Sequence, residues 1–309
     1  MAQGPFSCSP NVRQRSLAPP ALRIKAGLAL LLAALALGAR ATGGEALPPS
    51  SEEGLYRFAN QLRDEEDTQR AITEYRRLLF HFPHGERAGE ARLELARCYA
   101  CAQKWDQAEA HLVRLMSPSR DRALARRASY ERAELRFAAE RFEQAASAYD
   151  QFATDYPGSP RAHEARWRRA WSLLLARRFD LAERAFRAIE RPSPHAAAAR
   201  ELAGESRHLA RRRRKSPLLA GILGIVPGLG HFYCGRYRDG LVALAFNGLL
   251  GWGAGSAYGK GADAAGTVLG LLGVNFYVGG IFGGVNWAHR TNRAADQRRI
   301  DALRRKHGL

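Results

Sequence analysis

The sequence of 309 residues predicts an all-α protein in which a helical solenoid is followed by a transmembrane helical bundle. Three observations predict this fold class. A pattern with a period of 37 residues runs through residues 52–210, which read as amphipathic helices. Residues 216–289 are apolar and contain 19 of the 30 glycines. Fourteen of the eighteen net positive charges lie beside apolar stretches, at the N-terminus, in residues 211–215 and in residues 290–309.

The location of the positive charge argues against a nucleic-acid partner. A protein that neutralises phosphates needs its basic residues on one folded surface. Here residues 51–210 carry a net charge of only +3, whereas residues 1–50 carry +4 and residues 211–215 and 290–309 carry +5 each. Basic residues that flank apolar stretches are typical of membrane proteins. We therefore expect the lipid bilayer, and no nucleic acid, among the partners.

Residues 1–41 have the pattern of a secretory signal peptide. Four basic residues precede the uncharged run from Ala26 to Ala39, and Ala39-Arg40-Ala41 matches an A-x-A cleavage pattern. We expect cleavage after Ala41, followed by a linker over residues 42–51; the alternative is an uncleaved anchor of marginal length. No cysteine closely follows the apolar run, so we expect no lipid attachment there.

Residues 52–210 contain four units in which small and large apolar residues recur 37 apart. Small residues let the two helices of a unit touch, and large residues fill the seam to the next unit. One unit cannot bury its own apolar face, whereas four stacked units can. The small positions are Ala59, Ala96, Ala133 and Ala170 in the first helices and Ala71, Ala108, Ala145 and Ala182 in the second; a large position holds Tyr75, Leu112, Tyr149 and Phe186; Pro83, Pro157 and Pro194 close three units.

This pattern of small, aromatic and terminal proline positions resembles the tetratricopeptide repeat, whose usual period is 34. The longer unit, with its Pro157-Gly158-Ser159 junction, is similar to the repeats of bacterial periplasmic proteins of two types. These are the outer-membrane assembly lipoprotein type and the Tol-Pal coordinator type. The resemblance implies a protein or peptide partner in the bacterial envelope.

The inner face of the first helix in successive units is the expected partner-binding groove. Its aromatic side chains alternate with hydrogen-bonding groups, which suits a peptide laid in a groove. The alternative is that the aromatic residues only pack neighbouring helices. The groove residues are Tyr56, Asn60, Arg63, Arg97, Tyr130, Glu134, Phe137, Trp167 and Trp171.

The chain shows no motif that supports an enzyme. Cys98 and Cys101 form a C-x-x-C, which in an exported protein suggests redox chemistry or half a metal site. One period later Leu135 and Ala138 stand at those positions, so we expect structural cysteines, with an intrahelical disulfide as the alternative. The nine histidines are scattered. We expect no catalytic residue, no metal and no cofactor.

The C-terminal module, residues 216–289, holds three uncharged stretches near residues 217–234, 240–259 and 264–288. The second and third have the length of a membrane span, about 20 residues. The first contains Pro227-Gly228, which makes it either a kinked span or a re-entrant hairpin. Glycines that recur four apart within these stretches predict close packing of helices.

One motif in the first stretch resembles that of a small bacterial and eukaryotic membrane domain with two transmembrane segments. That family has a G-x-H-x-F-Y-x-G motif near its first span. The resemblance supports membrane integration and implies no reaction. The residues concerned are Pro227, Gly228, Gly230, His231, Phe232, Tyr233 and Gly235.

Two topologies follow from the basic run at residues 211–215 and the basic tail at residues 290–309. A signal peptide and three crossings of the cytoplasmic (inner) membrane place the repeats in the periplasm and the tail in the cytoplasm, and this is the arrangement we expect. If the first stretch is re-entrant, only two crossings remain and both basic segments share one side.

The sequence thus predicts a membrane-anchored scaffold or adaptor of the bacterial cell envelope, which binds a protein or peptide through the repeat groove. The alternative function is a membrane transport or protein-insertion component, whose repeats recruit cargo or a partner.

Overall fold

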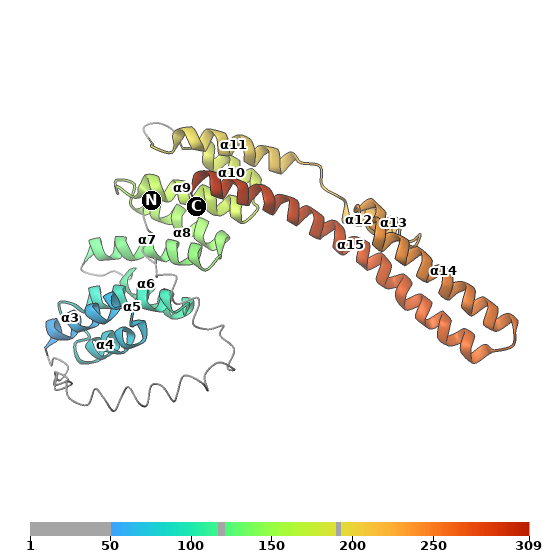
Figure 1. Cartoon of the computed structure of the whole chain (residues 1–309). Coiled ribbons are helices and arrows are strands. Elements are labelled where there is room, and N and C mark those ends of the chain that lie inside the picture. The colour runs from blue at the N-terminus through green and yellow to red at the C-terminus, as the bar shows by residue number, and fades with distance from the viewer. Residues whose placement is uncertain (1–50, 117–120, 190–192, 309) are drawn as a thin grey trace, which may run out of the picture. The chain divides into compact units, whose positions relative to one another are not determined.

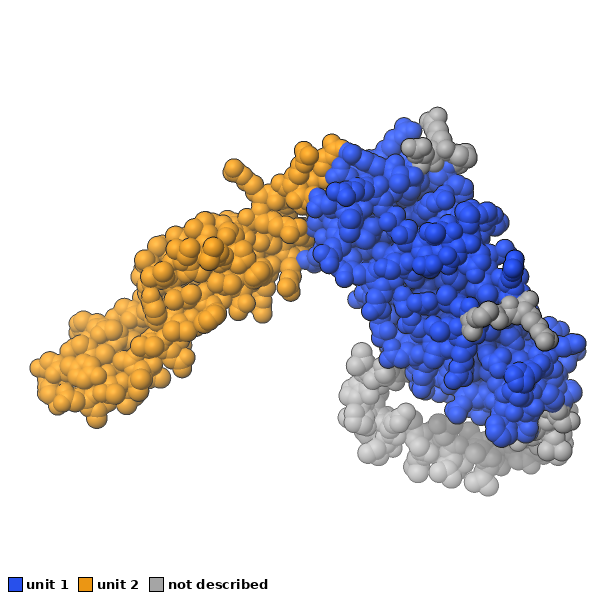
Figure 2. Space-filling view, turned by 180° about the vertical axis from the view of Figure 1, so that it is seen from behind, with its two compact units in different colours: residues 1–203 blue, residues 204–309 orange. Residues whose placement is uncertain are grey.

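The computed structural model describes residues 51–116, 121–189 and 193–308, and within these ranges it contains helices and no strand. The expected signal peptide lies outside them. The chain divides into two compact units, Met1–Ala203 and Gly204–Leu309, which Figure 2 shows in different colours.

The first unit contains four helix pairs, in which each helix packs against the next along the chain (Figure 1). The first helix of each pair is one that the sequence predicts to line the groove. The pairs are α3 (Glu52–Asp64) with α4 (Thr68–His81), α5 (Ala88–Cys101) with α6 (Trp105–Met116), α7 (Arg122–Ala138) with α8 (Phe142–Asp155), and α9 (Ala162–Leu175) with α10 (Phe179–Arg187). The unit boundary falls within the following helix, α11 (Ala196–Arg211).

The turn inside every pair contains one residue in the left-handed conformation, with φ between 57° and 62°. In each turn the next N–H bonds the carbonyl five residues earlier at 2.9 Å, which closes a Schellman motif and ends the first helix. The four turns therefore share one geometry, although none uses glycine. The left-handed residues, again 37 apart, are Glu66, Gln103, Glu140 and Arg177.

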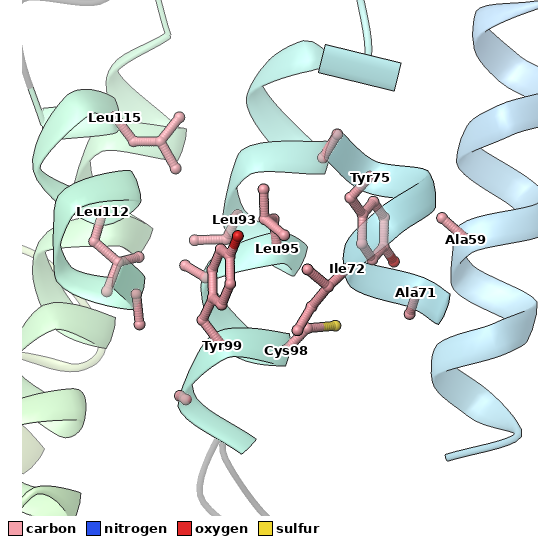
Figure 3. Packing of buried hydrophobic residues seen from close by; sticks show 14 of the residues in the cluster. Ala59, Ala71, Ile72, Tyr75, Leu93, Leu95, Cys98, Tyr99, Leu112 and Leu115 are labelled. Carbon is pink, nitrogen blue, oxygen red and sulfur yellow. The ribbon is translucent and has the colours of Figure 1, made fainter. Parts of the chain in front are cut away.

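Apolar side chains at the repeated positions form the core of the first unit. All eight alanines of the two small series are fully buried, and so are the four large residues from Tyr75 to Phe186. In Figure 3, Ala71, Ile72 and Tyr75 of α4 lie between Ala59 of α3 and the side chains of α5. Small residues thus allow close approach within a pair, and large ones fill the space between pairs.

The second unit contains two long helices, α14 (Tyr237–Gly259) and α15 (Asp263–His307), which form an antiparallel hairpin (Figure 1). Both are long and apolar enough to cross a membrane, by length and composition. Phe246 and Phe276 pack across the hairpin with ring centroids 4.9 Å apart. The basic tail continues α15 without a break.

The first apolar stretch of this unit is not one continuous helix. It forms α12 (Pro217–Leu223) and α13 (Leu229–Tyr233), of seven and five residues, which pack against each other and against α15. The chain reverses at Pro227-Gly228, where Gly228 has φ 88°. A helix rises 1.5 Å per residue, so neither piece spans a hydrocarbon core of about 30 Å. The re-entrant alternative fits this geometry.

Glycines of the second unit approach backbone atoms most closely in the α12–α13 region. A Cβ on Gly228 would overlap the carbonyl oxygen of Gly240, and one on Gly230 would lie 2.5 Å from the carbonyl oxygen of Ala220. By contrast, a Cβ on Gly251 or Gly270 would meet nothing within 4 Å. Only some of the predicted glycine pairs therefore bring helices together within the described chain.

Candidate functional site

Helices α3, α5 and α7 are joined by a ladder of ion pairs along the predicted groove face. Arg63 Nη1 lies 2.6 Å from Glu94 Oε2, and Arg97 Nη1 lies 2.8 Å from Glu94 Oε1. The Arg97 guanidinium also binds Glu131 through Nε and Nη2. Burial raises the pKa of the Glu131 carboxyl, against the opposing effect of the Arg97 hydrogen bond. The ladder holds successive units in register.

A second polar cluster continues this face over α7, α8 and α9. The Tyr149 hydroxyl donates a hydrogen bond of 2.8 Å to Glu134 Oε1. Arg168 Nε lies 3.8 Å from Glu134 and 3.0 Å from Glu164. His195 Nε2 lies 3.0 Å from the other oxygen of Glu164. Burial, followed by the charge on Glu134, raises the pKa of Tyr149 well above its usual value.

The largest aromatic residues of the predicted groove are inside the protein. Trp171 is fully buried, and Trp167 and Tyr130 are each 6% exposed. The Trp167 ring stacks on His195 at 4.5 Å, and the Tyr130 ring packs edge-on against Phe152 at 5.2 Å. These three side chains are in contact with neighbouring helices rather than with solvent.

The remaining groove residues are half-buried and also have partners. Asn60 Oδ1 accepts a hydrogen bond of 2.6 Å from the Tyr75 hydroxyl. A guanidinium lies over the ring of Tyr56, and that of Arg168 lies 5.6 Å from the ring centroid of Phe137. The structure therefore brings the nine residues onto one series of helices, with most of their polar groups already paired to other side chains of the repeats.

Sequence analysis missed Glu94, Glu131 and Arg168, which complete these networks. The signal was present as opposite charges separated by one period less one helical turn. Arg97 and Glu131 are 34 residues apart, as are Glu134 and Arg168. Such ion pairs connect the first helices of adjacent units, and each charged side chain uses its partner to balance its charge.

Comparison with known protein families identifies the repeats. Two family models, both described as tetratricopeptide repeat, match residues 62–135 and residues 130–197. The chain contains tetratricopeptide repeats. The predicted fold class, an all-α solenoid of such repeats, is confirmed, whereas the finer likenesses to envelope proteins and to the two-segment membrane family stay predictions. No curated protein matches the chain.

The two cysteines of the C-x-x-C, Cys98 and Cys101, are not bonded to each other. Cys98 is a free, buried thiol, so the alternative of an intrahelical Cys98–Cys101 disulfide is not realised. Burial raises the pKa of Cys98 to about 12, which keeps the thiol protonated and unreactive at neutral pH. Within the described ranges, no group of three or more His, Cys, Asp and Glu side chains is placed to hold a metal ion.

The glycine-histidine motif of the second unit closes the turn between α12 and α14. Gly228 and Gly230 allow the close approaches described above, and Gly235 takes φ 82° before α14. The Phe232 ring stacks on Tyr237 at 6.2 Å. The Tyr233 hydroxyl accepts a hydrogen bond of 3.0 Å from the Ser216 backbone. These motif residues therefore have local structural roles.

His231 is a motif residue that lines a cavity beside α14 and α15. It is 8% exposed, and its Nε2 would lie 3.0 Å from a Cβ on Gly283. The cavity, of about 560 Å³, is bounded by His231 and by Asp239, Asn247 and Asn275 among apolar side chains of α14 and α15. Sequence analysis missed the last three because they lie on α14 and α15, outside the motif.

The two basic segments of the second unit are bound to each other. The Lys215 N–H donates to Asn292 Oδ1 at 2.9 Å, and Asn292 Nδ2 donates to the Lys215 carbonyl at 2.8 Å. Arg212 and Arg214 lie 3.5 Å and 3.4 Å from Asp296, which is buried. Lys215, just before α12, therefore lies beside Asn292, which follows the apolar part of α15.

Proposed function

We propose that the protein is a membrane-anchored interaction scaffold or adaptor of the bacterial cell envelope. Tetratricopeptide repeats imply a protein or peptide partner. The observation that supports the anchor is the hairpin of α14 and α15, whose large apolar side chains point outward. Such side chains are stable toward lipid and unfavourable toward water.

We propose two membrane crossings instead of the three expected from the sequence. The paired hydrogen bonds of Lys215 with Asn292 support this arrangement, because they hold the chain before α12 at the level of α15 just beyond its apolar part. No apolar span separates the repeats from Lys215. Repeats and tail then share one side of the inner membrane, and the signal peptide expected in residues 1–41 supports the periplasmic side.

Protease added to intact spheroplasts tests this topology, with a tag after Leu309. Two crossings and an exported domain lead to digestion of both repeats and tag. A digested repeat domain with a protected tag would show three crossings. Protection of both would show that the repeats are cytoplasmic and that the export prediction is wrong.

The interaction function is tested by in-cell crosslinking of the full-length protein from a photoreactive residue at exposed Phe80 of the repeats. Substitutions in the repeats are compared with substitutions at Gly228 and Gly284, where α12, α13 and α15 approach closely. A scaffold loses its crosslinked partner through the repeat variants alone. Loss through the glycine variants alone, at unchanged protein level, would contradict it.

The cavity at His231 favours the second function, a transport or protein-insertion component. A nearly buried imidazole that faces a cavity in an apolar hairpin is more typical of a binding path than of an inert anchor. If the protein has this function, we expect His231→Gln to abolish transport or insertion in cells. The same substitution should leave crosslinking of the repeats to their partner unchanged. An inert anchor tolerates the same substitution.

A further inference from the structure

The repeats contain a basic cleft on the side formed by α4, α5 and α6, away from the ion-pair ladder. It encloses about 630 Å³ and includes Arg76 and Arg77 of α4, Arg92 of α5, and His111 and Arg114 of α6. Thr73, Leu79, Phe80, Pro83 and Leu95 complete its lining. We call these ten residues the basic cleft.

The positive charge of the basic cleft is only partly balanced. Arg77 lies 3.8 Å from Glu74, and Arg92 donates to the Pro83 carbonyl at 2.8 Å. Arg76 and Arg114 are exposed and form no ion pair with a described residue. Burial, and then the charge of Arg114, lowers the pKa of Arg92.

The floor of the basic cleft contains a polar atom without a partner. The His111 ring stacks on Tyr99, with centroids 5.6 Å apart, and its Nδ1 is buried with no hydrogen bond in the described part of the chain. Burial, followed by the neighbouring arginines, lowers the pKa of His111. The neutral ring thus offers a hydrogen-bonding edge beside several cations.

The repeat fold itself does not require these side chains. One period later, the positions of Arg76, Arg92, His111 and Arg114 hold residues without charge. Those residues are Val113, Ser129, Ala148 and Gln151. The basic side chains are therefore specific to one cleft, and their reason lies outside the packing of the solenoid.

An exposed aromatic ring lies next to this charge. Phe80 is 81% exposed at the end of α4, and Leu79 and Leu95 line the same cleft. An inorganic anion makes no use of an exposed ring, whereas a peptide with acidic and aromatic residues contacts both the arginines and the ring. The shape and the charge together favour a peptide.

We infer that the basic cleft binds an acidic peptide segment of the partner, whose carboxylates pair with Arg76, Arg92 and Arg114 and whose apolar side chain packs on Phe80. This inference rests on the proposed interaction function and names its surface. It differs from the predicted groove, whose charged groups are already paired to other side chains of the repeats.

Fluorescence anisotropy tests the inference with the full-length protein in detergent micelles. The probe is a fluorescein-labelled peptide of about twelve residues that alternates Glu with Gly around a central Phe. Its matched controls replace every Glu with Gln, or Phe with Ala. Charge-assisted contacts across an interface weaken when one partner is reversed, so we expect Arg76→Glu/Arg114→Glu to raise Kd at least about tenfold.

Two further comparisons separate a specific cleft from general attraction to a basic protein. Arg122→Glu/Arg166→Glu makes the same charge change at exposed positions outside the cleft, and we expect Kd to stay within about twofold. Phe80→Ser weakens binding of the Phe peptide and leaves the Ala peptide unchanged. Circular dichroism melts confirm that each variant is folded.

Several results would overturn the inference. Equal binding of the Gln peptide, or equal weakening by the Arg122/Arg166 control, would show that the cleft is not the site. Displacement of the peptide by low millimolar inorganic phosphate would indicate a small-anion site, and selective binding of phosphatidylglycerol vesicles would indicate a lipid site. A crosslinked partner in cells together with failure of the peptide would refute the cleft alone, leaving the interaction function in place.

Discussion

The repeats and the hairpin of α14 and α15 are both built from helices rich in small residues, yet the repeats bury their large apolar residues and the hairpin exposes them. In the repeats Tyr75, Tyr149 and Phe186 are fully buried. In the hairpin Trp252 is 73% exposed and Phe282 is 64% exposed. In water the burial of large apolar side chains drives packing, whereas lipid removes that drive and leaves close backbone contact. The difference is the one expected if the repeats fold in water and the hairpin lies in lipid, as we propose.

Small residues follow the same division. The alanines of the repeats are buried without exception in both series, because each faces a partner helix in water. Among the glycines of the second unit, those near Pro227 contact backbone, whereas Gly251, Gly255 and Gly270 meet nothing within 4 Å of a built Cβ. A periodic glycine is therefore weaker evidence for a contact than a periodic alanine in a soluble helix.

The largest effect is expected from truncating a core residue of the repeats. Tyr149→Ala removes a fully buried ring and the donor to Glu134, and we expect a loss of about 3–5 kcal/mol. The matched change in the hairpin, Phe282→Ala, removes an exposed ring, and we expect it to have little effect. Hydrogen exchange of the full chain in micelles measures the local free energy of unfolding. A large loss at Phe282 would break the comparison.

A smaller effect is expected from adding one methyl group to the turn between α12 and α13. Gly228→Ala forces a Cβ into the Gly240 carbonyl at a positive φ, with an expected cost of about 1–3 kcal/mol. Gly251→Ala meets open space in a helix and is neutral or slightly stabilising. Thermal melting of both variants in micelles gives the difference. Equal melting temperatures would show that the turn tolerates a side chain.

The sequence allowed the core of the repeats to be predicted almost completely, since periodic alanine and aromatic positions depend only on the helix period. The residues of the groove could be predicted only in part. Whether Trp167 or Tyr130 faces a partner or a neighbouring helix depends on residues that the fold places beside them, such as His195 and Phe152. That information is tertiary, so the pattern of one helix could not supply it.

The turns and the first apolar stretch show a similar limit. Glutamate, glutamine and arginine at the left-handed positions give no signal in the sequence, because glycine is the residue that usually marks such turns. Pro227-Gly228 did predict a break in the first stretch. The pairing of Lys215 with Asn292 joins residues 77 apart and was not visible in any local pattern.

The repeats and the hairpin should also respond with opposite changes in stability when a left-handed turn residue gains or loses its side chain. Glu140 holds φ 57° without glycine, so Glu140→Gly relieves strain and should stabilise the repeats by about 0.5–1 kcal/mol. Gly261 has φ 74° in the hairpin turn, and Gly261→Ala should destabilise it by about 1 kcal/mol although its Cβ meets no atom. Urea unfolding and micelle melting measure the two changes, and effects of the same sign would contradict this explanation.

The smallest effect is expected from the pH dependence of two carboxylates in the repeats. Burial raises the pKa of Glu131 above its value in the unfolded chain, so its contribution to stability is complete below the unfolded pKa and is lost as pH rises through the folded pKa. Hydrogen bonds from Arg57 and Arg87 lower the pKa of Glu53, so its contribution is present above the unfolded pKa and is lost as pH falls.

Glu131→Gln and Glu53→Gln variants separate the two directions in urea unfolding between about pH 4 and 7, around the reference pKa of glutamate. Relative to Glu131→Gln, the wild-type chain should lose stability as pH rises through this range. Relative to Glu53→Gln, it should gain stability over the same change. Parallel curves for the two pairs would mean that burial does not govern Glu131. Opposite slopes would show that burial outweighs the Arg97 ion pair at Glu131, whereas the hydrogen bonds of Arg57 and Arg87 govern Glu53.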